Sequence, residues 1–130
     1  MQKFTTLFMF DGKAEQAMIF YDSVFSDSEI VEITRYGENE AGAAGTVKHA
    51  TFKLNGQEFM AIDSSVKQGF TFTPSISLYI KCETNKEIDE FFKKLSEDGQ
   101  VLMPLSKYDF SERFVWVADK FGVSWQLSLA

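Results

Sequence analysis

The clearest alternation of apolar and polar positions lies in Val47–Ser64, with the sequence VKHATFKLNGQEFMAIDS. It predicts two β-strands joined at Asn55-Gly56, because a type I′ turn needs φ > 0 at both central residues and Asn-Gly satisfies this. Both faces of this hairpin carry apolar residues, so we expect both to be covered. The predicted cross-strand pairs are Leu54–Gln57, Lys53–Glu58, Phe52–Phe59, Thr51–Met60, Ala50–Ala61, His49–Ile62 and Lys48–Asp63.

Two amphipathic helices and further strands are predicted on either side of this hairpin. One apolar stripe follows Ala14, with apolar residues three and four positions apart as far as Phe25. A second helix begins at a capping box formed by Thr84 and Glu87 and ends at Asp98-Gly99, a left-handed C-terminal cap. Strands are predicted at 4–10, 30–36, 75–82, 100–103, 112–118 and 123–129, and loops at 37–46 and 104–111, the first as a mobile flap.

The two halves of the chain repeat the order β-α-β-β-β. A shift of 71 positions places apolar residues of the first half on apolar residues of the second, as for Val24 and Leu95. Tandem modules of this kind bury a shared core that one copy cannot close. We therefore predict one domain over residues 1–130, with a first module at 1–64, a connector at 65–74 and a second module at 75–130.

Composition narrows the classes of function. The net charge of −6 argues against a nucleic-acid binder, which needs a basic surface, and no apolar run is long enough for a transmembrane helix. The N-terminal sequence lacks the layout of a signal peptide, and the single cysteine, Cys82, fits a reducing compartment, so we expect a cytoplasmic protein. The 14 phenylalanines indicate a large aromatic core or an apolar cavity.

Four segments, in this order, resemble one family across nearly the whole chain. They are MFDGKAEQAMIFYDSVF, HATFKLNGQEFMAID, the Phe-Thr-Phe before SISLYIKCET, and DKFGVSWQL. They resemble the PhnB-like proteins, often described as a 3-demethylubiquinone-9 3-methyltransferase domain. These belong to the vicinal oxygen chelate superfamily of glyoxalase I, bleomycin-resistance proteins and extradiol dioxygenases. The resemblance implies an α+β fold of tandem βαβββ repeats, whose curved mixed sheets form a cup, and a homodimer.

The resemblance also implies where a metal would bind. In the superfamily's metal enzymes, a His or Gln on the first strand and a Glu on the last strand of each module hold a divalent ion. These places fall at Thr6, Ala61, Ser77 and Gln126, none of which is a His or a carboxylate. We therefore predict no metal site and no cofactor, with a divalent metal as the alternative. The sequence has no glycine-rich strand-to-helix turn of the kind that binds nucleotides, so it does not support the methyltransferase description.

A ligand-binding cup is the function we expect from these residues. We assign to it Thr6, Phe8, Phe52, Phe59, Ser77, Tyr79 and Gln126. Ser124 and Ser128 extend Gln126 into a polar row that would orient a small molecule. The aromatic rings, including Phe10, either line the cup or fill it, and Ser77 and Tyr79 either bind a ligand or face water.

Other reactive side chains have simpler interpretations. His49 could act as a general base, but we expect a structural histidine packed against a helix. Cys82 lies on the apolar side of its strand and is expected to be an inert core thiol. Glu58 and Asp63 are explained by their cross-strand lysines.

Three functions remain open on this basis. The first is binding of a small molecule without a catalytic metal. The second is a metal-dependent lyase, isomerase or dioxygenase, and the third is a dimeric scaffold without a ligand. The sequence predicts no catalytic residue, and it names neither the ligand nor a reaction.

Overall fold

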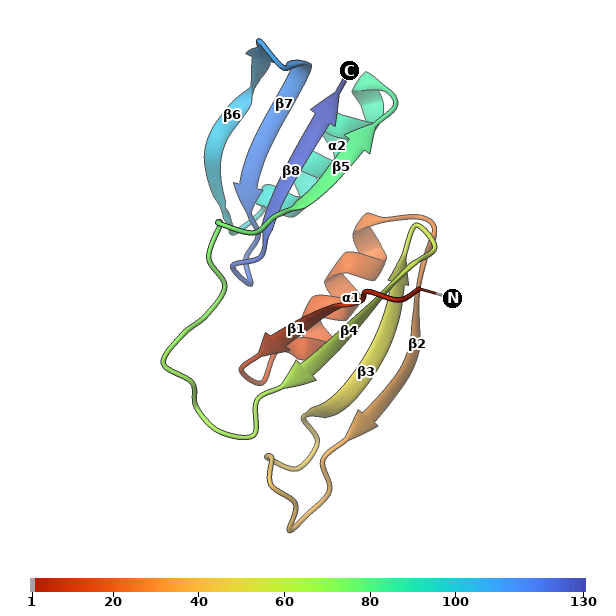
Figure 1. The fold of residues 1–130 in the computed structure, drawn as a ribbon, viewed down its shortest axis with the longest axis vertical. Coiled ribbons are helices and arrows are strands. Elements are labelled where there is room, and N and C mark those ends of the chain that lie inside the picture. Colours follow the sequence, from red (N-terminus) through yellow and green to blue (C-terminus); the bar gives the residue numbers. More distant parts are fainter. Residues whose placement is uncertain (1) are drawn as a thin grey trace. The chain divides into compact units, whose positions relative to one another are not determined.

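The computed structural model describes residues 2–130, which form two helices and eight strands in two compact units (Figure 1). One unit extends as far as Phe70 and the other begins at Thr71. The first contains β1 (Thr6–Phe10), α1 (Ala14–Val24), β2 (Ser28–Arg35), β3 (Val47–Leu54) and β4 (Gln57–Asp63). The second contains β5 (Leu78–Cys82), α2 (Asn85–Ser96), β6 (Gln100–Tyr108), β7 (Ser111–Ala118) and β8 (Ser124–Leu129).

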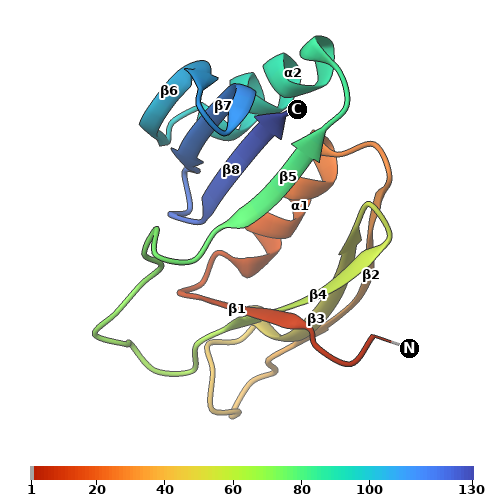
Figure 2. The ribbon, with the colours of Figure 1, turned by 45° about the horizontal axis from the view of Figure 1, so that its top comes forward.

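The two units share one topology. Their sheets have the orders β1-β4-β3-β2 and β5-β8-β7-β6. In each, the first strand pairs in parallel with the last, and the other neighbours are antiparallel. A helix connects the first two strands of each unit, and Figure 2 shows α1 lying against one face of its sheet. The predicted α+β fold of two mixed βαβββ modules is confirmed.

The hairpin at the centre of the first unit has the predicted turn. Asn55 and Gly56 have φ values of 51° and 77°, as a type I′ turn requires. The pairing from Leu54–Gln57 to Ala50–Ala61 has the predicted register. The expected pair of Lys48 with Asp63 is wrong, because Lys48 Nζ lies 2.6 Å from Glu40 Oε2.

Asp63 instead connects three elements of the first unit. Its side chain is buried, and Oδ1 accepts a hydrogen bond from Ala14 N at 3.0 Å. Oδ2 accepts one from Val47 N at 2.9 Å. Lys13, at the N-cap position of α1, makes no side-chain capping bond, so the carboxylate from the end of β4 satisfies the first helical N–H.

Helix α2 is capped within its own sequence. Thr84 Oγ1 accepts a hydrogen bond from Glu87 N at 3.1 Å, and Glu87 Oε1 accepts one from Glu83 N at 2.9 Å. This confirms the predicted capping box. At the other end, Asp98 has the left-handed φ of 57°, and Gly99 is packed closely against the backbone after β7.

Strand β6 is longer than predicted. We expected a strand that ends before Pro104 and a loop from there to Ser111, but β6 continues to Tyr108. It is the edge strand of its sheet, and its register shifts between Met103 and Ser106. Proline is tolerated there, because an edge position or a bulge does not require its missing N–H.

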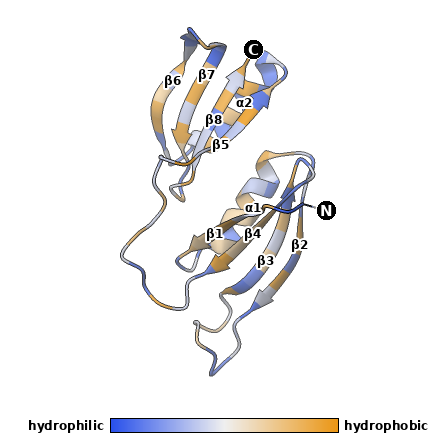
Figure 3. Ribbon diagram, viewed as in Figure 1, coloured by the Kyte–Doolittle hydropathy of each residue, from blue (hydrophilic) through white to orange (hydrophobic). Residues whose placement is uncertain are grey.

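Each sheet packs its most apolar face on its own helix. In the second unit this face carries buried Val115, Val117, Trp125 and Leu127, and α2 contributes Ile88 and Leu95. Apolar and polar residues alternate along the strands, as the hydropathy colours in Figure 3 show. A binding site on either sheet must therefore lie on the face that its helix does not cover.

Candidate functional site: the face of the second sheet opposite α2

The connection between the first strand and the helix differs by one residue between the units. Strand β1 begins at Thr6 and β5 at Leu78, a shift of 72, whereas α1 begins at Ala14 and α2 at Asn85, a shift of 71. The shift of 71 predicted from the sequence is therefore right for the helices and wrong for the first strands. Because side chains alternate between faces, this one-residue error assigns every residue of β1 to the wrong face.

The phenylalanines assigned to the cup belong to the core beneath α1. Phe8, Phe52 and Phe59 are 6%, 2% and 5% exposed. Phe52 stacks on Tyr21 of α1 with ring centroids 6.4 Å apart, and on Phe59 at 5.5 Å. The prediction that they line a ligand-binding face is therefore corrected: they pack against the helix, and Phe10 lies in the same core.

The two positions implied for a metal in the first unit lie on this same helix-packed face. Thr6 pairs with Phe59 at the exposed start of β1, and Ala61 is fully buried opposite Phe8.

His49 lies on the face opposite α1, not against the helix as expected. Its side chain is 43% exposed, and Nδ1 is 3.6 Å from Glu32 Oε1, a contact that is an ion pair when the imidazole is protonated. Thr51, Met60 and Leu7 are in register on this face. Its other half, at β1 and β4, is apolar, with Leu7 49% exposed.

In the second unit, Arg113 shows which face meets the helix. Its guanidinium donates to Asn85 Oδ1 at 3.0 Å and to Asp89 Oδ1 at 2.7 Å, both on α2. Strand alternation then places Trp116 on the opposite face, together with its register partner Gln126. Ser77 and Tyr79 fall on that face too, as the alternation along the strand predicts.

A continuous row crosses the four strands of this face. Tyr79 of β5 pairs with Gln126 of β8, Gln126 with Trp116 of β7, and Trp116 with Met103 of β6. We call these four residues the Gln126 row. Tyr79 is 51% exposed and the other three are half-buried. The row therefore offers an amide flanked by two aromatic side chains.

Ser124 joins the row to Ser77. Its side chain is 2% exposed, and its Oγ accepts a hydrogen bond from Trp116 Nε1 at 2.8 Å. Ser77 Oγ lies 2.6 Å from Ser124 Oγ, and Gln126 Nε2 donates to Ser77 Oγ at 3.4 Å. These bonds fix the indole and the amide in place on the sheet.

Trp116 and Met103 were not among the predicted site residues. They belong to the Gln126 row because of the way β7 pairs with β8 and with β6. To infer these pairings from the sequence, one would need the register set by the turn at Asp119–Gly122 and the irregular register of β6. The alternation in Phe114-Val115-Trp116-Val117 was the available signal, because it separates the tryptophan from the two buried valines.

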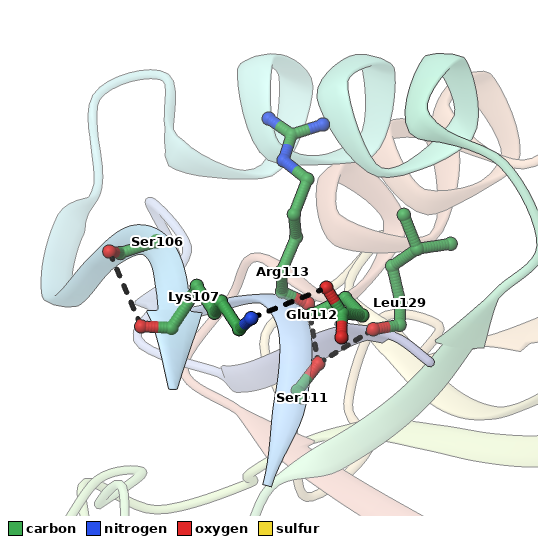
Figure 4. Close-up of polar contacts among 6 residues, drawn as sticks. All are labelled: Ser106, Lys107, Ser111, Glu112, Arg113 and Leu129. Atoms are coloured by element: carbon green, nitrogen blue, oxygen red, sulfur yellow. Dashed lines mark hydrogen bonds and ion pairs between the residues drawn. The ribbon is translucent and has the colours of Figure 1, made fainter. Parts of the chain in front are cut away.

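The end of the same face beyond Gln126 is filled by protein. Phe114 is 2% exposed beneath Phe110, whose ring is 4.9 Å away, and Tyr108 at 5.7 Å. Ser111 Oγ lies 2.7 Å from Ser128 Oγ. The single hydroxyl hydrogen of Ser111 is shared between the carbonyl oxygens of Arg113, at 2.7 Å, and Leu129, at 2.8 Å, and Figure 4 draws both contacts. Ser128 therefore stabilises the sheet and does not reach the Gln126 row.

The side chains at the positions implied for a metal do not fit a divalent cation. First-row divalent ions are held by imidazole, thiolate or carboxylate, with three or more such ligands in protein sites. Thr6, Ala61, Ser77 and Gln126 supply two hydroxyls, a methyl group and an amide. Among residues 2–130, no group of three or more His, Cys, Asp or Glu side chains could hold a metal ion.

Cys82 lies on the α2 side of β5 and is 6% exposed. Burial, reinforced by the charge of Glu87, raises the pKa of its thiol to about 11. The reactive thiolate is therefore scarce at neutral pH, which fits the interpretation of Cys82 as an inert core thiol.

The predicted flap between β2 and β3 is tied at its base. Tyr36 N donates to Thr46 O at 2.9 Å, and Gly45 N donates to Tyr36 O at 2.8 Å. The hydrogen bond from Lys48 lowers the pKa of the Glu40 carboxyl, and the same contact raises the pKa of Lys48.

Within the described part of the chain, neither helix has the length and apolar character to cross a membrane.

Comparisons with known proteins agree with this fold. A PhnB protein from Bacillus cereus has 64% sequence identity and a TM-score of 0.96, aligned over 99% of this chain and 100% of that chain. A glyoxylase/bleomycin resistance protein/dioxygenase domain from Frankia sp. has 12% identity and a TM-score of 0.70 over 100% and 93% of the two chains.

A fosfomycin resistance protein, FosX, from Listeria monocytogenes, solved with Mn(II) and 1S,2S-dihydroxypropylphosphonic acid, has 11% identity. Its TM-score is 0.67, over 98% of this chain and 93% of that one, and this likeness concerns the fold alone. No curated protein matches the chain.

The sequence matches the family described as 3-demethylubiquinone-9 3-methyltransferase over residues 2–128. Together with the paired βαβββ modules, this match confirms the resemblance found in the sequence segments. The chain belongs to the PhnB-like, 3-demethylubiquinone-9 3-methyltransferase family.

Proposed function

We propose that the second sheet binds a planar, uncharged small molecule on the face opposite α2, without a catalytic metal. The observation that carries this proposal is the Gln126 row, in which an amide lies between the aromatic side chains of Tyr79 and Trp116. Binding sites of small molecules combine apolar and aromatic surface with a few fixed polar groups, and the row has this composition.

The burial of these side chains supports binding over a purely structural role. Trp116 and Gln126 are half-buried and Tyr79 is 51% exposed, so their side chains are reachable from outside the unit. Ser124 and Ser77 hold the indole and the amide in one geometry, which lowers the conformational entropy lost when a ligand binds. Phe8, Phe52 and Phe59 have no part in this proposal, because they fill the core of the first unit. Thr6 has no part in it either, because it lies on the helix-packed face of the first sheet.

A thermal-shift screen of planar carbonyl and heteroaromatic compounds tests the proposal. A ligand present at a hundred times its Kd adds about 2.7 kcal/mol of stability. We expect such shifts in the unsubstituted protein and their loss in Gln126→Ala and Trp116→Phe, while Gln57→Ala, at an exposed glutamine of the first unit, keeps them. The proposal is wrong if no compound shifts the melting temperature, or if both site variants keep the shift. Stoichiometric zinc, nickel, manganese or iron in protein purified without chelator would contradict the metal-free part.

A homodimer in the cytoplasm completes the proposed function. Support for the dimer comes from the open edges of the two sheets and from exposed Leu7 and Val31, 49% and 48% accessible, on the first unit. The reducing compartment is supported by the single, unpaired Cys82. We expect a dimer mass by light scattering at micromolar concentration, and a monomer mass would refute it.

The reaction named in the family's description is not part of this proposal. Each unit has one helix and a mixed sheet, whereas the nucleotide-binding folds with a glycine-rich turn have parallel sheets covered on both faces. A description shared by a family does not assign chemistry to residues that lack the groups for it.

A further inference from the structure

The direction of the hydrogen bonds at the Gln126 row follows from the chemistry of Trp116. An indole N–H can only donate, so Ser124 Oγ must accept the bond of 2.8 Å from Trp116 Nε1. Ser124 has one further polar contact within residues 2–130, the Oγ of Ser77 at 2.6 Å. A buried hydroxyl whose hydrogen lacks an acceptor carries a penalty, so Ser124, at 2% exposure, donates to Ser77.

The hydrogen of Ser77 is then left for a ligand. Ser77 Oγ accepts from Ser124 and, at 3.4 Å, from Gln126 Nε2, so both of its lone pairs are used. No acceptor for its own O–H lies among the described residues, and the side chain is half-buried. Since a hydroxyl that accepts two hydrogen bonds becomes a stronger donor, Ser77 offers a polarised O–H.

Gln126 supplies the complementary group beside it. Its Nε2 is engaged by Ser77, which leaves Oε1 as an acceptor with no donor in the described part of the chain. A donor at Ser77 and an acceptor at Gln126 are therefore adjacent on one sheet face, and the rings of Tyr79 and Trp116 lie on either side of Gln126 in the row.

We infer that this site selects planar rings with a cyclic amide edge, in which a carbonyl oxygen accepts from Ser77 and the neighbouring N–H donates to Gln126 Oε1. Ser124 acts as a positioning residue, since it touches no ligand and sets the direction of the chain from Trp116 to Ser77. The inference rests on the proposed function and specifies its ligand class.

Titration of the protein with 2-pyridone, followed by saturation-transfer NMR, tests the inference directly. The matched compound is N-methyl-2-pyridone, which keeps the ring and the carbonyl and lacks the N–H. We expect 2-pyridone to bind about tenfold more tightly, the size of one hydrogen bond lost with its acceptor left unpaired. Equal binding of the two compounds, or no binding of either, would overturn the inference.

Variants of the two buried serines on β8 test the role of Ser124. Ser124→Ala is expected to weaken 2-pyridone binding about tenfold, and Ser124→Thr, which keeps the hydroxyl, to restore most of it. Ser128→Ala is the control, because Ser128 lies on the same face and bonds Ser111 instead. Unchanged binding of 2-pyridone in Ser124→Ala would contradict the positioning role. If that variant fails to fold, the comparison of the two compounds in the unsubstituted protein still decides the ligand class.

The inference can fail while the proposed function stands. Planar compounds without an amide edge that raise the melting temperature in a Gln126-dependent manner would retain the site and refute its selectivity. If no compound of either kind binds, both are wrong.

Discussion

Replacement of Asp119 by alanine is expected to lower the free energy of unfolding by about 3–5 kcal/mol. The carboxylate is 3% exposed in the turn between β7 and β8. Its Oδ1 accepts from Phe121 N at 2.8 Å and Val123 N at 3.1 Å, and its Oδ2 accepts from Trp125 Nε1 at 2.9 Å. Alanine removes the acceptor of these three hydrogen bonds, and a hydrogen bond to a charged group contributes about 1.5–3 kcal/mol.

Urea denaturation followed by circular dichroism measures this loss. Asp119→Asn should lose less, because the amide keeps one oxygen for either the backbone donors or the indole. Asp109→Ala, at an exposed position two residues before β7, is the control and should stay within about 0.5 kcal/mol of the unsubstituted protein. A loss below about 1 kcal/mol in Asp119→Ala would contradict the importance assigned to this carboxylate.

Replacement of Gly99 by alanine is expected to cost about 3 kcal/mol through steric overlap. A Cβ at this position would lie 2.3 Å from Ala118 O and 3.1 Å from the Asp119 Cα, both backbone atoms that cannot rotate away. Gly99 is not among the glycines with a left-handed φ, so the cost comes from the neighbouring chain and not from its own backbone. The strand end at Ala118 or the start of β6 must move.

Thermal and urea unfolding of Gly99→Ala beside Gly69→Ala tests this account. Gly69 has nothing within 4 Å of a Cβ, so its substitution adds a methyl group in open space and should change stability little. Equal stability of the two variants would show that the close approach after β7 relaxes without cost.

The sequence predicts best where the signal is local. The turn at Asn55-Gly56 and the capping box of Thr84 and Glu87 are each set by residues within a few positions, and both are present as expected. Strand alternation also places Ser77, Tyr79 and Gln126 on one face of the second sheet. These features need no knowledge of the rest of the chain.

Predictions failed where the outcome depends on distant pairing or on one residue of loop length. The face assigned to Phe8 was wrong because the connection before α1 has one residue more than the connection before α2. Strand β6 can continue through Pro104 because it lies at the edge of its sheet. The sequence of β6 alone does not indicate that edge position. The Trp116–Ser124 bond likewise depends on the pairing of β7 with β8.

The different capping of the two helices has a consequence for the order in which the modules assemble. Helix α2 contains its whole cap in Glu83–Glu87, so its first turn can be stabilised as soon as that segment is helical. Helix α1 receives its capping oxygen from Asp63, 49 residues further along the chain. The start of α1 therefore gains this bond only after β4 has reached its parallel partner, and a contact of such sequence separation carries a larger loop-closure entropy. Two modules with the same topology thus differ in when the first turn of the helix gains its capping bond: α2 gains it within a local segment, and α1 gains it together with its sheet.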